Sequence, residues 1–148
     1  MIRTIKASDI VELQDIIEDA LYLADPNAVP SETYMLEALT IAMKPSTSFY
    51  LKVCEEDGHI VGFLAAQVTQ SFMLSTKQTN VITSYAKPDY QYCLKELFED
   101  MCKWAYSLAA YDVYVLSQEN TGGLSLKCLD ELGAKPISSE YLYQLDRD

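Results

Sequence analysis

Residues 113–137 read VYVLSQENTGGLSLKCLDELGAKPI, and this stretch decides the fold class. Its β-branched and aromatic beginning, VYVLSQ, predicts a strand that stops at Glu119-Asn120. The following TGGLSLKCLDEL predicts a helix, which Asn120 is expected to cap by accepting from unpaired N–H groups of the first turn. Gly133 stands where a helix C-terminus favours a left-handed residue. Two short strand-like pieces are then expected to close the chain.

A hairpin is predicted in the middle of the chain. Phe49 to Cys54 and Ile60 to Gln70 are apolar runs joined by EEDGH, and Asp-Gly between such runs is the strongest short-range hairpin signal. Residues Asn80–Ala86 predict a further strand that ends before Lys87-Pro88.

Three more helices are predicted around these strands. After a first strand at Ile2–Ile5, Ser8 or Asp9 is expected to cap a helix with apolar residues at helical spacing. Pro30-Ser31-Glu32 opens a second helix that ends before Pro45. The longest helix is expected at about residues 90–108, with a wide apolar stripe formed by Leu94, Leu97, Phe98, Met101, Trp104 and Ala105.

The expected order is therefore β-α-α-β-β-β-α-β-α-β-β. Antiparallel hairpins followed by a β-α-β unit predict an α/β fold of the α+β type, with a mixed sheet and helices on both faces. A chain of 148 residues with 49% apolar residues spread throughout fits one domain, residues 1–148.

The charge balance excludes several partners. The chain carries 22 acidic and 11 basic residues, a net charge of −11, which argues against nucleic acid and anionic membranes as ligands. No apolar run is long enough to span a bilayer and no signal-peptide core is present, so a cytoplasmic location is expected. The acidic charge has two interpretations. It either serves only to keep the surface solvated, or it lets the protein engage a basic partner, for example by mimicking DNA.

No metal site is expected. The cysteines, Cys54, Cys93, Cys102 and Cys128, form no CxxC pair, and His59 is the only histidine. No zinc ligand set can be assembled from these residues with the usual spacing. We interpret the cysteines as small buried hydrophobic residues in a reducing compartment.

The element order, the IVGFLAAQV strand after the hairpin and the Asn120…Leu132-Gly133-Ala134 pattern together resemble the GNAT superfamily of N-acetyltransferases. The tail ENTGGLSLKCLDELGAK is similar to small GNAT-type proteins of tailed phages, which implies a location in the host cytoplasm or the virion.

The resemblance implies that acetyl-CoA lies between two splayed parallel strands, here Asn80–Ala86 and Asp112–Gln118. Its pantetheine arm pairs with the open edge of the first strand, and its pyrophosphate lies on the N-terminus of the following helix. The cofactor-binding residues that this implies are Ala86, Gln91, Tyr92, Cys93, Leu94, Lys95 and Asn120.

Two departures from the family pattern weaken this expectation. The family's phosphate motif, Q/R-x-x-G-x-G/A, reads Gln91-Tyr92-Cys93-Leu94-Lys95-Glu96 here, so that Leu94 and Glu96 replace the glycines. The place of the tyrosine that protonates the leaving thiolate falls near Leu129, beside Cys128, and no tyrosine lies within residues 121–132. Acetyl-CoA binding is therefore expected to be weak or lost.

Acyl transfer to an amine also needs a general base and a contact to the thioester oxygen. By analogy with the family, the candidate catalytic residues are Ser84 and Tyr85 on the strand facing the acceptor, with Glu55 at the hairpin as an alternative base. Tyr85, Tyr90 and Tyr92 crowd the mouth of the expected cleft, where they either stack on a ligand or serve only packing.

The sequence leaves two functions open. The first is a divergent GNAT-type acyltransferase that uses acetyl-CoA, without a metal, to modify an unidentified amine on a small molecule or a protein. The second is a non-catalytic GNAT-fold protein that works through a protein partner or as a homo-oligomer. In that form it is either a virion-associated phage protein or an acidic inhibitor of a host protein.

Overall fold

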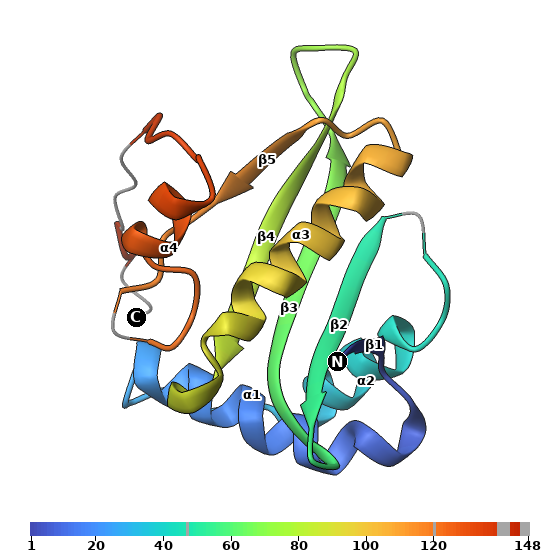
Figure 1. Cartoon of the computed structure of the whole chain (residues 1–148), viewed down its shortest axis with the longest axis vertical. Coiled ribbons are helices and arrows are strands. Elements are labelled where there is room, and N and C mark those ends of the chain that lie inside the picture. Colours follow the sequence, from blue (N-terminus) through green and yellow to red (C-terminus); the bar gives the residue numbers. More distant parts are fainter. Residues whose placement is uncertain (47, 120, 139–142, 146–148) are drawn as a thin grey trace.

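The structure is a computed structural model that describes residues 1–46, 48–119, 121–138 and 143–145. The elements run in the order β1 (Ile2–Thr4), η1 (Ala7–Asp9), α1 (Ile10–Ala24), α2 (Glu32–Ala42), β2 (Phe49–Glu56), β3 (His59–Gln70), β4 (Lys77–Ala86), η2 (Pro88–Tyr90), α3 (Tyr92–Ser107), β5 (Asp112–Val115) and α4 (Leu126–Glu131) (Figure 1).

The described strands form a mixed sheet in the order β1-β2-β3-β4-β5. The first three pairings are antiparallel, and β4 pairs with β5 in parallel, because α3 carries the chain back across the sheet. Figure 1 shows α3 lying along one face, with α1 and α2 behind the sheet. The predicted mixed α/β fold with helices on both faces is confirmed.

The central strand β3 is buried on both faces, which explains its nearly continuous apolar sequence. Leu64 and Ala66 pack toward α3 and α4. Phe63 and Ala65, which alternate with them along the strand, pack in a separate cluster with residues of α1 and α2. The alternation of side chains along one strand thus builds the core on both sides of the sheet.

The β2–β3 hairpin confirms the prediction from Asp57-Gly58. Both turn residues have positive φ, 53° and 80°, as a two-residue type I′ turn requires. The pairing of Glu56 with His59 closes the hairpin directly beside this turn.

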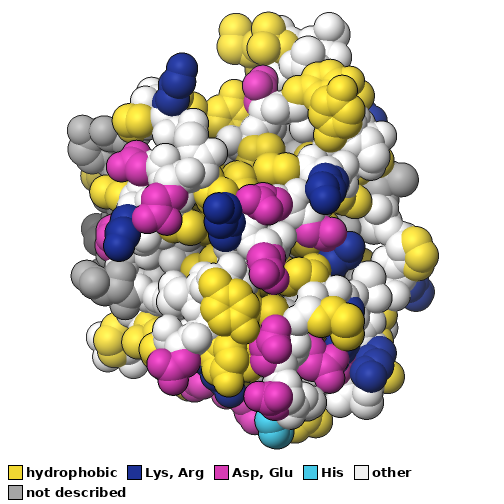
Figure 2. All heavy atoms as spheres, viewed as in Figure 1, with side chains coloured by type: hydrophobic (Ala, Val, Ile, Leu, Met, Phe, Trp, Pro, Cys, Tyr) yellow, Lys and Arg dark blue, Asp and Glu magenta, His cyan; other side chains and the backbone are white. Residues whose placement is uncertain are grey.

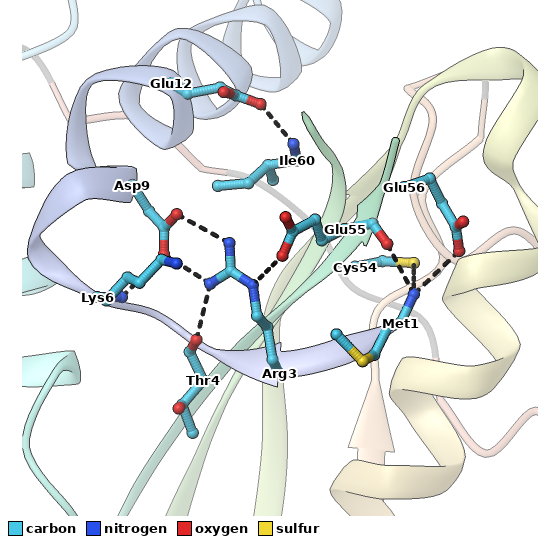
Figure 3. Close-up of polar contacts among 10 residues, drawn as sticks. All are labelled: Met1, Arg3, Thr4, Lys6, Asp9, Glu12, Cys54, Glu55, Glu56 and Ile60. Carbon is cyan, nitrogen blue, oxygen red and sulfur yellow. Dashed lines mark hydrogen bonds and ion pairs between the residues drawn. The ribbon is translucent and has the colours of Figure 1, made fainter. Parts of the chain in front are cut away.

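An ion cluster fastens the N-terminal segment to the hairpin (Figure 3). The Arg3 guanidinium donates to Asp9 Oδ2 at 2.7 Å and Oδ1 at 2.9 Å, and its Nε donates to Glu55. Asp9 Oδ2 also accepts from the Lys6 N–H at 2.9 Å. The hydrogen bonds from Arg3 lower the pKa of both carboxyl groups. A carboxylate held ionised in this way is a poor general base, so Glu55 is better explained as a structural residue.

The strand and the helix of the stretch 113–137 are both shorter than predicted. β5 ends at Val115 instead of Gln118, and α4 begins only at Leu126. Ser125 caps α4 by accepting from the Cys128 N–H at 3.3 Å. The expectation that Asn120 is this cap is therefore wrong, and Asn120 itself lies outside the described residues.

The C-terminus of α4 agrees with the prediction. Gly133 has a φ of 86°, and its N–H donates to the Asp130 carbonyl at 3.0 Å. The Ala134 N–H donates to the Leu129 carbonyl at 2.9 Å, which completes a Schellman motif. In residues 134–138 and 143–145 no strand is formed, and the remainder of the two predicted closing strands lies outside the described part of the chain.

Candidate cofactor cleft

The candidate site is the wedge between β4 and β5. Their parallel pairing extends only from Gln78↔Asp112 to Val81↔Val115. Beyond Val81 the strands diverge, so within the described part of the chain Ser84 to Ala86 have no strand partner on that side. This is the splay that the sequence predicted between these two strands.

A loop of the chain itself lies in this wedge. We call residues 118–119 and 121–124 the cleft segment. The Ala86 N–H donates to the Gly122 carbonyl at 2.9 Å, and the Ser84 N–H donates to the Gln118 side-chain oxygen at 3.1 Å. The Ala86 carbonyl accepts from the Gln91 side-chain amide at 2.6 Å. The backbone groups at this edge of β4, which were expected to pair with a ligand, are thus hydrogen-bonded within the chain.

Ser84 lies at the centre of this arrangement. Its side chain is buried, its hydroxyl donates to Gln118 Oε1 at 3.0 Å, and it accepts from the Leu124 N–H at 3.0 Å. The Gln118 N–H in turn donates to the Leu124 carbonyl at 2.7 Å. The predicted catalytic role of Ser84 has no support in this geometry, because the hydroxyl is engaged as both donor and acceptor.

Two glycines allow the cleft segment to approach β4. A Cβ on Gly122, whose φ is 78°, would lie 2.6 Å from the Tyr85 ring. A Cβ on Gly123 would lie 2.6 Å from the Ser84 carbonyl oxygen. The sequence prediction placed this pair inside a helix, although adjacent glycines disfavour helix, and that was the signal for a close backbone approach.

Tyr85 separates the cleft segment from a pocket on the α1 side. This open pocket, of about 340 Å³, is lined by Asp19, Tyr22, Leu23 and Tyr85. Burial raises the pKa of Tyr85, and the negative charge of Asp19 raises it further. A phenol with a raised pKa keeps its proton near neutral pH, where it can donate a hydrogen bond.

The start of α3 is the place predicted to bind phosphate. Gln91 precedes the helix and makes no side-chain cap, because its amide reaches back to Ala86 and to the Gly122 carbonyl at 3.2 Å. Cys93 and Leu94 are buried in the core, since the apolar stripe of α3 faces the sheet. Their side chains cannot contact a cofactor, so the prediction for these two residues is limited to their backbone groups.

The exposed side chains at the start of α3 are mixed in charge. Tyr92, Lys95 and Glu96 are exposed, and the rings of Tyr90 and Tyr92 are 6.3 Å apart. Figure 2 shows many acidic side chains on the lower part of this face. The electrostatic setting is therefore less favourable to an anion than a helix N-terminus alone would be.

The last helix has Leu129 and Cys128 at the place where the family pattern has a proton-donating tyrosine. Leu129 packs in the core, and burial raises the pKa of the neighbouring Cys128 thiol. Over the described residues, no cluster of three or more histidine, cysteine or acidic side chains can hold a metal ion. No helix in the same part of the chain is long and apolar enough to cross a membrane.

No family model and no curated protein sequence matches the chain. Solved structures of acetyltransferases do match it over nearly the full length of both chains. An acetyltransferase from Trypanosoma brucei is 19% identical with a TM-score of 0.73, covering 98% of this chain and 99% of its own. The ribosomal-protein-alanine N-acetyltransferase from Brucella melitensis biovar Abortus 2308 is 14% identical with a TM-score of 0.76 and 98% coverage of each chain.

The aminoglycoside N-acetyltransferase AAC(6′)-Iy, in complex with the bisubstrate analogue CoA-S-monomethyl-acetylneamine, is 15% identical with a TM-score of 0.78. The match covers 99% of this chain and 97% of that one. At these identities the likeness establishes architecture. The chain has the GNAT acetyltransferase fold.

Proposed function

We propose that this protein binds an acyl-CoA thioester, with acetyl-CoA as the reference ligand, along the edge of β4 and transfers the acyl group to an amine. The observation that carries this proposal is the divergence of β4 from β5 beyond Val81 in a GNAT fold. It leaves the N–H groups of Ser84 and Ala86 on an edge that none of the described strands covers.

The hydrogen bonds now made at this edge support the fit of such a ligand. The acceptors for Ser84 and Ala86 are the amide oxygens of Gln118 and Gly122. A pantetheine arm presents amide oxygens of the same kind, so the edge has donors of the right chemistry. The bound thioester supplies the activated acyl group, and the edge of β4 orients it.

The α1 side of the cleft supports a cationic acceptor. Asp19 offers a carboxylate, and Tyr22 and Tyr85 offer aromatic rings around the pocket. This combination favours a cationic amine, through charge attraction and cation–π contact. The net charge of −11 adds a long-range attraction for cations. A small molecule and a basic protein side chain both satisfy this chemistry.

Calorimetric titration with acetyl-CoA tests the proposal. We expect saturable heat with a dissociation constant in the micromolar to millimolar range, and a weaker response with acetyl-pantetheine if the start of α3 binds phosphate. An absence of heat at millimolar acetyl-CoA from folded protein contradicts the proposal.

A specific observation favours a second candidate, a non-catalytic interaction protein. The edge of β4 is hydrogen-bonded within the chain, and α4 carries no tyrosine. The β3–β4 turn, at the top of Figures 1 and 2, exposes Phe72, Met73 and Leu74, which are 102%, 86% and 66% accessible. Such a group is typical of a contact surface, for example within a phage particle or against a host protein.

A further inference from the structure

We infer that the cleft segment is a built-in occupant of the acyl-CoA site, which must leave the edge of β4 before a ligand can pair with it. This inference rests on the proposed function and adds its regulation: the protein exists in a closed form, seen here, and an open form that binds the ligand.

The closed form uses the groups that the ligand needs. The N–H groups of Ser84 and Ala86 donate hydrogen bonds to amide oxygens of the cleft segment, at 3.1 Å and 2.9 Å. A pantetheine arm cannot accept from the same N–H groups at the same time. Binding of the ligand and binding of the cleft segment to β4 are therefore mutually exclusive.

The cleft segment is also fixed by contacts away from β4. Leu124 is fully buried in the core, and its carbonyl accepts a hydrogen bond from the Gln118 N–H. The Glu119 carboxylate accepts from the Leu126 N–H at 2.6 Å at the start of α4. With Gly122 against the Tyr85 ring, these contacts hold the described residues of the cleft segment in place.

Gln91 links the cleft segment to the start of α3. Its side-chain amide donates to the carbonyls of both Ala86 and Gly122, at 2.6 Å and 3.2 Å. Departure of Gly122 removes one of these two acceptors and leaves the bond to Ala86 in place. Opening therefore releases an amide donor at the helix N-terminus, next to the place expected for the pyrophosphate.

The population of the open form sets the measured affinity, since the apparent dissociation constant is the intrinsic one divided by the open fraction. Each hydrogen bond that holds the segment adds to the closed population. A variant that opens the cleft is therefore expected to bind acetyl-CoA about tenfold more tightly.

The opening variant is Gly122→Ala, because the added Cβ would collide with the Tyr85 ring at 2.6 Å. The matched control is Gly133→Ala. Gly133 has a similar positive φ, 86° against 78°, but none of the described residues comes within 4 Å of its added Cβ. Both changes introduce left-handed backbone strain, and only Gly122→Ala should act on the cleft. Gln118→Ala is a second opening variant without such strain, for use if Gly122→Ala does not fold.

Two measurements are made on each protein: amide hydrogen exchange of Ser84 and Ala86, and calorimetric titration with acetyl-CoA. We expect both amides to be protected in the wild type and in Gly133→Ala, and to exchange faster in the opening variants. We expect acetyl-CoA to bind the opening variants more tightly and to restore the protection of the two amides.

The possible failures are distinguishable. Unprotected amides in the wild type overturn the inference, because the closed form is then not populated. Equal affinity of the wild type and the opening variants, despite faster exchange, also overturns it and leaves the proposed function intact. If the two amides exchange freely in the opening variants but no variant binds acetyl-CoA, the proposed function itself is overturned. The inferred competition between the ligand and the cleft segment then falls with it.

Discussion

At the scale of single residues, Arg3 is the side chain on which the N-terminal segment depends. It joins Asp9 and Glu55, and the Arg3 and Asp9 side chains are only 19% and 8% exposed. Arg3→Ala should lower the free energy of unfolding by about 3 kcal/mol, because it leaves a buried carboxylate without its partner. Urea denaturation measures the loss.

The pair Lys52–Asp100 offers the control for this prediction. The Lys52 Nζ and Asp100 Oδ2 atoms are 2.8 Å apart, close to the 2.7 Å of Arg3–Asp9, but both side chains are about one third exposed. Lys52→Ala should therefore cost about 1 kcal/mol or less. Equal losses in the two variants would show that the burial of the Arg3 cluster adds nothing.

Asp9 also predicts a dependence of stability on pH. The Arg3 hydrogen bonds hold its pKa below the ordinary value, with a smaller contribution from the Lys6 N–H. The unfolded state therefore takes up the proton first, and the stabilisation is complete above the ordinary Asp pKa of about 3.9 and lost as pH falls below it. In urea titrations between about pH 2 and 6, Asp9→Asn should show a shallower acid loss than the wild type.

Ser84 and Tyr85 show what single residues in a sequence can and cannot predict. The pattern of apolar residues placed both on the strand beside the cleft. It could not show that the Ser84 hydroxyl is engaged by Gln118 and Leu124, which follow it by 34 and 40 positions. A contact of this range depends on how the whole chain folds back.

At the scale of elements, α3 was predicted well both in extent and in its apolar stripe. Leu94, the first residue of that stripe, is 1% exposed and faces the sheet, although it stands at a glycine position of the phosphate motif. Leu94→Ala should therefore cost about 3 kcal/mol of stability and should not strengthen acetyl-CoA binding. Denaturation and calorimetry of one protein preparation test both parts.

Glu96 is the residue of this helix that should affect a phosphate directly. It is exposed near the start of α3, where it repels an anion. Glu96→Gln should strengthen acetyl-CoA binding by about 1 kcal/mol, about fivefold, if the helix start binds phosphate. Glu99→Gln, one turn further along and also exposed, removes the same charge and should change the affinity less. Equal effects of the two variants would exclude the helix start as the phosphate site.

The elements around the cleft show which boundaries depend on local sequence and which depend on tertiary contacts. The β2–β3 turn and the end of α4 were predicted correctly, because Asp57-Gly58 and Gly133 act within their own turns. The start of α4 was predicted five residues too early, because Gly122-Gly123 serve contacts to β4 that no local pattern reveals. Helix boundaries at a site are thus decided by tertiary contacts.

At the scale of the molecule, the fold was predictable because the order of elements restricts the possible topologies. A hairpin followed by a right-handed β-α-β crossover leaves few ways to arrange β2 to β5. The structural matches at 14–19% identity agree with this, since the architecture is shared although few individual residues are. The chemistry depends on those individual residues, so the element order that predicts the fold does not predict the chemistry.

The net charge of −11 leads to a prediction that belongs to the whole molecule. An acidic protein repels the phosphates of acetyl-CoA at long range, and salt screens this repulsion. The Debye length falls from about 30 Å at 0.01 M salt to about 8 Å at 0.15 M. We therefore expect acetyl-CoA to bind a few-fold more tightly at the higher ionic strength, by calorimetry. Acetyl-pantetheine, which has no phosphate charge, is the control and should show no such change. A steady loss of acetyl-CoA affinity with salt would contradict this expectation. Salt would then be screening a net attraction between the phosphates and Lys87, Lys95 and the α3 N-terminus, which must outweigh the repulsion from the acidic surface.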